Sequence, residues 1–467
     1  MDKKYEEFQL GEDERCRFST DCNITGLNNN VLGVGGSGTG KTMSLMMPMI
    51  YNLENSNAIV VHTKKGIYEK TKAVLEKKGY NIIQIDLNEP ANSAYGYDPL
   101  LQCKTLNDVR DLAHSIAYCE HTGDAPPREP FWPQNAEKLI YLVLRYVFEG
   151  HYEKGRSMKE ALYLLDYLCY TDDFDVKSDP PIDDEIADYE ECERECAHLR
   201  GTKHKWKNSV SESQRKRWEQ INKNYPLHGE MRNWYYIDRA TYIQWKQFLD
   251  MSEQTGSSVV GQTTAPLNLM FNSDVRKIVG TDLPQFEIKE FLKPKTIAFI
   301  SVSPVNMAQH RFISIFYKQI FKDLFELGEK QPNGVLPHHV HVLCDDFATG
   351  CKVADFQDLI SIFREKGISA TMLVQSETQL SQMYGMESAQ TIINNCDTYV
   401  YMGGMDLYTA ANISKRVNHP LDKVLTMPLG QEYFFRRGQK PVITQRYNIL
   451  RDIKAMEKYN VEYTHAI

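Results

Sequence analysis

The sequence predicts an α/β fold, in which a mainly parallel sheet carries helices on both faces and an all-helical domain is inserted into the chain. Towards both ends of the chain, short apolar runs alternate with helical stretches, which is typical of parallel strands buried on both faces. Between them lies a long region with a helical pattern alone. We therefore expect the α/β domain at residues 1–155 and 257–467, and the inserted all-α domain at residues 156–256.

The first part of the α/β domain contains strand–helix–strand units. Strands are expected where apolar, mostly β-branched residues run together, at residues 31–34, 58–62 and 81–86. Helices are expected between them, at residues 40–53 and 67–78. Because a helix joins each strand to the next, these strands are expected to be parallel.

The same alternation resumes in the second part of the α/β domain. Helices are expected at residues 309–327 and 355–366. Strands are expected at residues 296–302, 339–344, 369–375 and 397–402.

The net charge of −8 argues against a surface that binds nucleic acid all over, but it leaves room for a local basic channel. No apolar run approaches the ~20 residues that a membrane-spanning helix needs. The charged N-terminus lacks the apolar stretch of a signal peptide. We therefore expect a cytoplasmic protein, or one held at the cytoplasmic face of the plasma membrane through a partner.

A phosphate-binding loop follows the first strand, because residues 35–42 match the pattern G-x4-G-K-[ST] in full. Glycines let the backbone fold around a phosphate chain, and the backbone N–H groups at the start of a helix then point at the phosphates. The pattern predicts binding of ATP and Mg²⁺, with Lys41 on the terminal phosphates and Thr42 on the metal. The predicted nucleotide-binding residues are Gly35, Gly36, Ser37, Gly38, Thr39, Gly40, Lys41 and Thr42.

An acidic pair, Asp345 and Asp346, directly follows the strand expected at residues 339–344. Ligands in open α/β sheets bind at the carboxyl ends of strands. A phosphate-binding loop needs one carboxylate near the metal, and commonly a second acid that orients the attacking water. We expect Asp345 on the Mg²⁺ side and Asp346 as the residue that polarises water.

Two polar residues follow the acidic pair. Arg364 lies on the next helix, from which it can reach the γ-phosphate of a neighbouring subunit; the alternative is a solvent-facing arginine beside Glu365 and Lys366. Gln375 ends the strand expected next to the acidic one, where it can sense the γ-phosphate; the alternative is an ordinary glutamine at a strand end.

Several short motifs together resemble one family. They occur in the family's order from about residue 8 to the C-terminus, and the resemblance is weakest across the helical insertion. They are Gly26-Leu-Asn-Asn-Asn30 before the loop, Lys65-Gly-Ile-Tyr-Glu-Lys-Thr71, Pro130-Phe-Trp132, Asp346-Phe-Ala348, Gln375-Ser-Glu-Thr-Gln-Leu380 and Asn395-Cys-Asp397. The ordered set is similar to the TraG/TraD family of type IV coupling proteins, the conjugative DNA-transfer ATPases.

The resemblance implies a RecA-like motor domain with an inserted all-α domain, acting as a hexameric ring with nucleotide sites between subunits. It implies ATP-driven delivery of single-stranded DNA and its attached relaxase to the channel proteins of a type IV secretion system. By position, Arg364 matches the family's arginine finger and Gln375 its sensor glutamine.

The sequence departs from the family in three places. The family's usual Asp-Glu pair is Asp345-Asp346, which shortens the water-orienting side chain by one methylene. The family's Asp-Pro-Lys-Gly after the second strand is Thr63-Lys64-Lys65-Gly66, so that an acid near the site is missing. The transmembrane helices that usually precede the motor domain are not seen, and we expect any membrane contact to be made through partners.

A basic stretch with interleaved tryptophans lies in the inserted domain, at residues 200–223. Such a stretch can contact DNA phosphates and stack on bases. The alternative is a solvated helical face balanced by the acidic run at residues 172–195. The candidate DNA-binding residues are Lys205, Lys207, Arg215 and Arg217.

Two alternatives to a conjugative DNA pump stay open. One is another ATPase of the FtsK/HerA type, which moves double-stranded DNA or secretes protein. The other is a docking scaffold for the relaxase complex, which binds nucleotide and hydrolyses little; the departures at Thr63 and Asp346 motivate it.

Overall fold

The computed structural model describes residues 5–64, 66–118, 129, 131–150, 155–168, 247–248, 251–280, 282–347 and 352–450. The chain divides into two compact units. The sheet unit comprises Met1–Tyr97, Cys119–Pro126 and Leu269–Ile467, and the helical unit comprises Asp98–Tyr118 and Pro127–Asn268.

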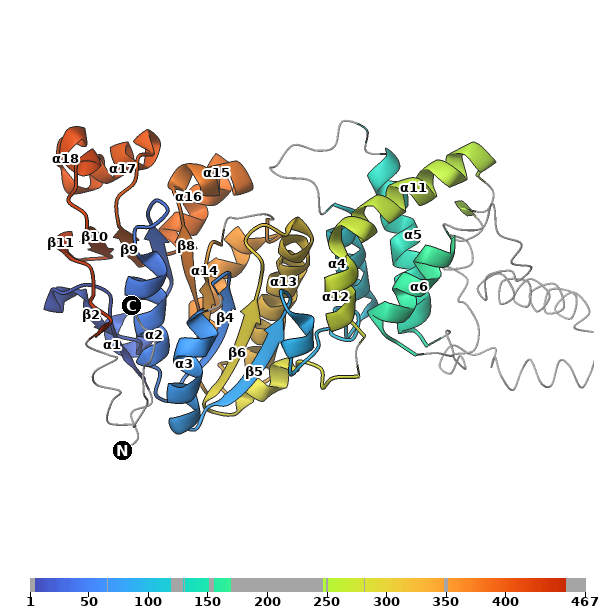
Figure 1. The fold of residues 1–467 in the computed structure, drawn as a ribbon, viewed down its shortest axis with the longest axis horizontal. Helices are drawn as coiled ribbons and strands as arrows, with labels where there is room; N and C mark the ends of the chain where they lie inside the picture. Colours follow the sequence, from blue (N-terminus) through green and yellow to red (C-terminus); the bar gives the residue numbers. More distant parts are fainter. Residues whose placement is uncertain are drawn as a thin grey trace, which may run out of the picture. The chain divides into compact units, whose positions relative to one another are not determined.

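The sheet unit is built on a nine-stranded sheet with the order β11-β10-β9-β3-β8-β7-β4-β6-β5 (Figure 1). Neighbouring strands from β9 to β5 are parallel, and β10 pairs antiparallel with both β9 and β11. The strands are β3 Val31–Val34, β4 Asn57–His62, β5 Asn81–Asp86, β6 Thr296–Ser301, β7 Val340–Cys344, β8 Ile368–Val374, β9 Thr398–Tyr401, β10 Gln431–Arg436 and β11 Val442–Gln445. The seven predicted strands are confirmed, whereas β10 and β11 were not predicted.

A second, two-stranded antiparallel sheet is formed by β1 (Glu7–Gln9) and β2 (Arg17–Ser19). It was not predicted either. Apart from the helices that cover the large sheet, the sheet unit contains shorter helices. They are α1 Cys22–Thr25, α12 Ser273–Ile278, α17 Leu407–Val417 and α18 Leu421–Leu425.

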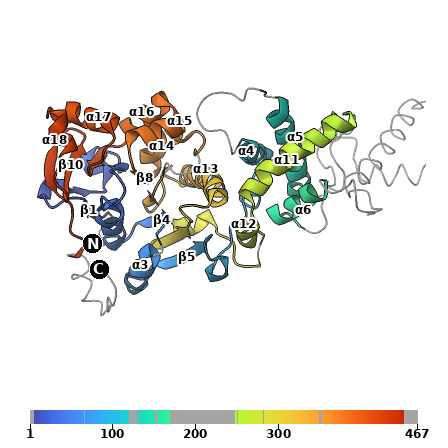
Figure 2. The same cartoon turned by 45° about the horizontal axis from the view of Figure 1, so that its top comes forward.

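Helices cover both faces of the large sheet because the chain crosses it in two directions. From β3 to β4 and on to β5 the chain moves towards one edge, and from β6 through β7 and β8 to β9 it moves towards the other. Since crossovers between parallel strands are right-handed, the two directions place their helices on opposite faces. One face carries α2 (Met47–Tyr51) and α3 (Gly66–Lys77) (Figures 1 and 2). The other carries α13 (Met307–Glu329), α14 (Phe356–Lys366), α15 (Glu377–Tyr384) and α16 (Met386–Asn394).

The helical unit contains α4 (Leu106–Ala117), α5 (Phe131–Phe148), α6 (Met158–Leu168) and most of α11 (Glu253–Met270). Buried Asp98 links the segment before α4 to the first residue of α6. Its carboxylate accepts hydrogen bonds from the backbone N–H groups of Leu100 and Met158, at 2.9 and 2.8 Å. Residues 169–246 lie outside the described residues, so the limits expected for the inserted domain, 156–256, stay a prediction. Within the described part of the chain, no helix has both the length and the apolar character that crossing a bilayer demands.

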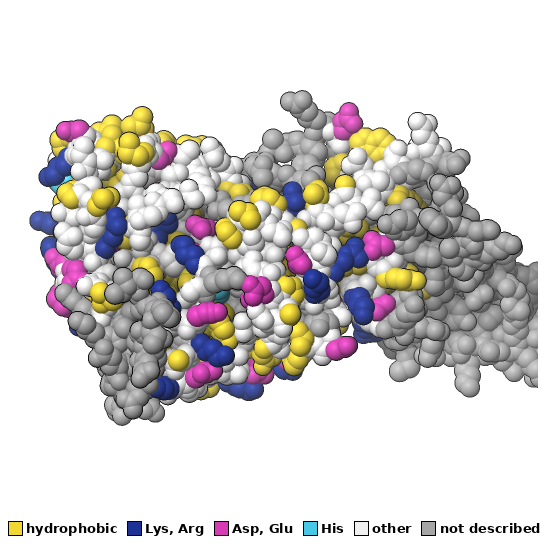
Figure 3. Space-filling view, viewed as in Figure 1, with side chains coloured by type: hydrophobic (Ala, Val, Ile, Leu, Met, Phe, Trp, Pro, Cys, Tyr) yellow, Lys and Arg dark blue, Asp and Glu magenta, His cyan; other side chains and the backbone are white. Residues whose placement is uncertain are grey.

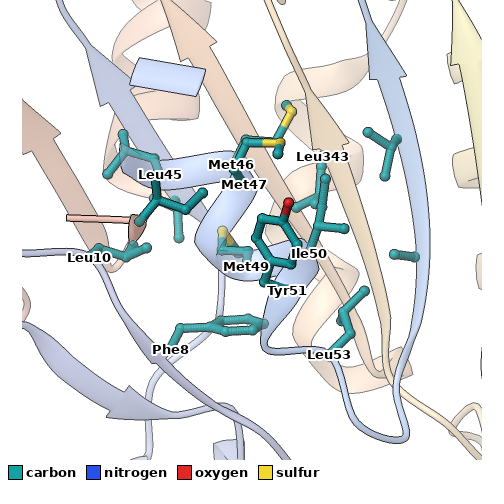
Figure 4. Packing of buried hydrophobic residues seen from close by; sticks show 14 of the residues in the cluster. Phe8, Leu10, Leu45, Met46, Met47, Met49, Ile50, Tyr51, Leu53 and Leu343 are labelled. Atoms are coloured by element: carbon teal, nitrogen blue, oxygen red, sulfur yellow. The ribbon is translucent and has the colours of Figure 1, made fainter. Parts of the chain in front are cut away.

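Most residues of the segment that follows the phosphate-binding loop are buried in apolar packing. It begins as a π-helical turn, Thr42–Met46, and continues as α2. Figure 4 shows Met46, Met49, Ile50 and Tyr51 of this segment among apolar side chains that include Phe8 and Leu343. A close-packed interior leaves little room for displacement, so the loop is anchored to a fixed support.

Candidate nucleotide-binding site

Four parallel strands bring most of the predicted site residues, and one further residue, Thr63, to one edge of the sheet. The phosphate-binding loop follows β3, Gln375 follows β8, Asp345 follows β7 and Thr63 follows β4. These four strands are neighbours in the order β3-β8-β7-β4. Because parallel strands end at the same edge, residues from distant parts of the sequence meet there.

The loop at residues 35–40 needs glycine at two positions, Gly35 and Gly40, for different reasons. The backbone N–H of Gly36 donates to the carbonyl oxygen of Gly403 at 2.9 Å. A Cβ on Gly35 would lie 2.7 Å from Oγ1 of Thr39 and 3.1 Å from Cβ of Met402. Gly40 has φ of 83°, a conformation that other residues rarely adopt. Glycine is thus required by the fold of the loop itself.

Lys41 closes the loop from within. Its Nζ donates to the carbonyl oxygens of Gly35 and Gly36, at 2.5 and 3.1 Å. The side chain is buried, and this desolvation lowers the pKa of Lys41 below its ordinary value, while the nearby carboxylate of Asp346 acts in the opposite direction. The lysine is therefore positioned inside the loop, where bound phosphate groups would lie.

The predicted metal-binding pair is brought together. The Thr42 hydroxyl donates to Oδ1 of Asp345 at 3.0 Å, and both side chains are buried. A hydroxyl and a carboxylate are hard oxygen donors, which Mg²⁺ prefers, and Mg²⁺ typically keeps several of its waters while it binds few protein ligands. The donor set therefore fits magnesium.

Thr63 and Lys64 also contact the Thr42–Asp345 pair, although neither was among the predicted site residues. The Thr63 hydroxyl lies 3.3 Å from Oδ2 of Asp345 and 3.2 Å from Oδ2 of Asp346. The Lys64 Nζ contacts the Thr42 hydroxyl and lies 3.3 Å from Oδ2 of Asp345. The signal that would have found them is their position directly after a parallel strand, at the edge where ligands bind.

A cavity of about 390 Å³ opens in front of the loop, a volume within the range of about 300–1,000 Å³ that small-molecule sites occupy. Asp346 and Gln375 line it, as expected of residues that act on a terminal phosphate. The other lining residues are Ser37, Gly38, Thr39, Gly40, Lys41, Thr42, Met43, Met47, Lys64, Gly66, Ile67 and Lys70. Lys70, on α3, is a further lysine that the sequence analysis did not single out.

Arg364 is not brought to this cavity. It lies near the end of α14, just before β8 begins, so it stands at the edge where strands start rather than where they end. Its side chain is exposed, and Nη2 contacts the carbonyl oxygen of Cys22 at 3.4 Å. The four candidate DNA-binding residues, Lys205, Lys207, Arg215 and Arg217, lie outside the described residues.

Arg446 is a further cation beside the loop. Its Nη2 donates to the carbonyl oxygen of Met402 at 2.8 Å, and a Cβ on Gly40 would lie 3.6 Å from its Nη1. Burial lowers the pKa of Arg446 below its ordinary value, and the nearby carboxylate of Glu432 offsets part of this effect. The C-terminal strands thus add positive charge on the side of the loop away from Asp345.

The chain is similar to known proteins in sequence and in fold. A sequence model of the family described as type IV secretory system conjugative DNA transfer matches residues 8–419. No curated protein matches the sequence at a significant level. Among solved structures, the bacterial conjugative coupling protein TrwBdeltaN70 in complex with sulphate has a TM-score of 0.59 at 14% identity, over 90% of this chain and 85% of that chain.

Two nucleotide complexes of TrwB are similarly close over the same shares, 90% of this chain and 85% of that chain. The complex with the non-hydrolysable ATP analogue ADPNP has a TM-score of 0.58 at 15% identity. The complex with ADP and Mg²⁺ has a TM-score of 0.57 at 16% identity. The predicted RecA-like fold is thereby confirmed.

Proposed function

Because the chain belongs to the family of type IV secretory system proteins of conjugative DNA transfer, we propose that it is an ATP-driven DNA translocase. It delivers single-stranded DNA and its relaxase to the channel of a type IV secretion system, as a coupling protein. The observation that carries the proposal is the hydrogen bond between Thr42 and Asp345 beside a phosphate-binding loop with an open cavity.

Each site residue has a distinct task in ATP hydrolysis. The loop N–H groups and Lys41 bind the phosphates, and Thr42 and Asp345 hold Mg²⁺. The metal would supply charge neutralisation at the β- and γ-phosphates. Asp346 orients the attacking water, and Gln375, which lines the same cavity, contacts the terminal phosphate.

Arg364 completes the site of a neighbouring subunit. It stands at the opposite end of β8 from Gln375, so it is presented away from the cavity of its own chain. An arginine finger supplied in trans stabilises the charge that develops in phosphoryl transfer. We therefore place nucleotide sites between subunits of a homo-oligomeric ring, a hexamer.

An exposed apolar surface beside the loop supports such an assembly. We call it the α17–α18 patch; hydrophobic side chains gather there in Figure 3. Its residues are Met405, Leu407, Tyr408, Leu421 and Leu429, of which Leu429 is 94% exposed. Gly403 and Gly404, which adjoin the loop, lead into it. Exposed apolar patches mark interaction sites, and the occupant we assign is a second copy of the chain.

The remaining partners follow from the family. We propose that single-stranded DNA is contacted by Lys205, Lys207, Arg215 and Arg217, that the relaxase arrives attached to that DNA, and that membrane contact is made through channel proteins at the cytoplasmic face.

Steady-state ATP hydrolysis, measured with and without single-stranded DNA, tests the proposal. We expect turnover that DNA stimulates and that Lys41→Ala abolishes. Tight nucleotide binding without turnover would contradict the translocase and favour the docking scaffold. Stimulation by double-stranded DNA alone would favour an FtsK/HerA-type pump.

A further inference from the structure

The Lys64 ammonium lies against the two groups, Thr42 and Asp345, that would hold the metal ion. Its Nζ contacts the Thr42 hydroxyl and lies 3.3 Å from Oδ2 of Asp345. The two oxygen groups are buried, whereas the Lys64 side chain is 57% exposed. A cation on a flexible stem therefore rests against two fixed oxygen ligands.

The ammonium and Mg²⁺ exclude each other from this position. Mg²⁺ requires ligand distances of about 2.0–2.1 Å in near-ideal octahedral geometry, and it would need the same oxygens that now face the Lys64 Nζ. The exposed stem lets Lys64 withdraw into the 390 Å³ cavity, which it already lines. Withdrawal leaves the Thr42–Asp345 pair free for the metal.

Among the described contacts, the other lysines of the cavity, Lys41 and Lys70, make none with the Thr42–Asp345 pair. Lys41 is buried and bound to the carbonyl oxygens of Gly35 and Gly36. Lys70 lines the cavity from α3, on the wall formed after β4. In the family that the sequence resembles, the position of Lys64 holds proline, which has no ammonium group. The feature belongs to this chain's own sequence.

We propose that Lys64 is a built-in substitute for the divalent cation. In the absence of metal, its ammonium holds the Thr42–Asp345 pair and neutralises the phosphate of a bound nucleotide; when Mg²⁺ binds, the ammonium gives way. The inference rests on the nucleotide site of the proposed function and adds a second mode of binding to it. The chain should thus retain nucleotide without metal better than a protein that lacks this lysine.

The test compares nucleotide affinity with and without metal. Fluorescently labelled ADP is titrated with the full chain in excess EDTA and in excess Mg²⁺, and the ratio of the two dissociation constants is the readout. For Lys64→Met we expect the ratio to rise about tenfold over the wild type, because a hydrogen bond to a charged group is worth about that factor in binding. The rise should come from weaker binding in EDTA, with binding in Mg²⁺ little changed.

Two further variants serve as controls. Lys64→Arg keeps a cation on a long stem, so its ratio should stay within about threefold of the wild type. Lys70→Met removes a positive charge from the same cavity, and because it stands in for no metal, its ratio should equal that of the wild type. Thermal unfolding of each variant confirms that the fold is retained.

The outcomes separate this inference from the proposed function. If Lys64→Met changes both dissociation constants by the same factor, or neither, Lys64 is not a substitute cation and the inference is overturned. If Lys70→Met raises the ratio as much as Lys64→Met does, the effect is general electrostatics and the inference is also overturned. If the wild type binds no ADP even with Mg²⁺, the proposed nucleotide site itself fails.

Discussion

Thr42 and Asp345 are 303 residues apart in the sequence and are joined by a hydrogen bond of 3.0 Å. The contact links the two halves of the sheet unit at the proposed nucleotide site. It exists because β8 alone separates β3 from β7, so that the helix after the loop reaches across the end of β8.

Replacing Thr42 with valine should weaken Mg²⁺-dependent ATP binding about tenfold, because the metal loses its hydroxyl ligand and Asp345 loses a hydrogen bond. Calorimetric titration of Mg-ATP measures the change. Thr71→Val is the matched control: Thr71 is also buried, on α3, and its hydroxyl donates to the Ile67 carbonyl oxygen at 2.8 Å rather than to a metal-binding group. Equal affinity of wild type and Thr42→Val would remove Thr42 from the metal site.

Asp346→Asn should lower the rate of ATP hydrolysis about 100-fold while the affinity for ATP stays near that of the wild type, because the amide cannot take a proton from water. Asparagine tolerates the left-handed backbone of this residue, whose φ is 51°, so the fold should be retained. Single-turnover hydrolysis and equilibrium binding separate the two effects. An unchanged rate would show that Asp346 does not activate water.

Arg364→Ala should abolish hydrolysis without weakening nucleotide binding, because the arginine acts on the neighbouring subunit's site. Mixed in equal amounts with Lys41→Ala, it should recover about a quarter of the wild-type activity, since one interface in four then combines an intact loop with an intact arginine. Arg437→Ala is the control: Arg437 contacts the carbonyl oxygen of Gly26 at the same edge of the sheet, and this variant should remain active. Absence of recovery in the mixture would contradict a site shared between subunits.

Leu407→Asp combined with Leu429→Asp should shift the chain from oligomer to monomer, because two charges would be buried in the interface that we assign to the α17–α18 patch. Sedimentation velocity at several protein concentrations measures the shift. Val305→Asp changes an equally apolar side chain, 84% exposed between β6 and α13, outside the patch, and it should leave assembly intact. If the double variant assembles like the wild type, the patch is not the interface.

The free energy of unfolding should fall as the pH drops from about 6.5 towards 5. Histidines in the unfolded chain bind protons in this range, whereas histidines buried in the native state do not. Burial lowers the pKa of His341 to about 3. The native state thus stays unprotonated there while the unfolded state titrates near 6.5, so His341 alone should cost roughly 2 kcal/mol at pH 5 relative to pH 7.5.

His341→Asn should remove the part of the pH dependence that is due to His341. Its effect on stability at pH 7.5 is a separate matter, because the substitution also changes the hydrogen bond between Nδ1 and the Ser369 hydroxyl. Urea denaturation of both proteins at the two pH values gives the difference. An identical loss of stability in both would show that His341 titrates normally.

The parallel strands could be predicted because most of them are buried along their whole length. A strand such as β4, in which all six residues are buried, leaves an uninterrupted apolar run at residues 58–61 of the sequence. The hairpin β10–β11 at the sheet's edge lacks such a run, since β11 is largely solvent-accessible. Its formation depends on pairing with β9, which the local sequence does not reveal.

The candidate site likewise contains residues that could be predicted from the sequence and residues that could not. The loop, Asp345 and Gln375 are recognisable because each stands directly after an apolar strand. The role of Lys64 could not be predicted, because its contacts require β4 and β7 to be neighbours. Strand order is a property of the whole sheet, and it was unknown until the fold was seen.

Strand β8 has one further consequence. Its seven residues have Gln375 directly after one end and Arg364 shortly before the other, and an extended segment of that length spans roughly 23 Å. In the proposed ring, strand β8 would connect the γ-phosphate of the nucleotide bound to one subunit with the arginine that this subunit presents to the next. If a displacement at one end were carried to the other, hydrolysis at neighbouring sites would be coupled and would proceed in sequence rather than independently.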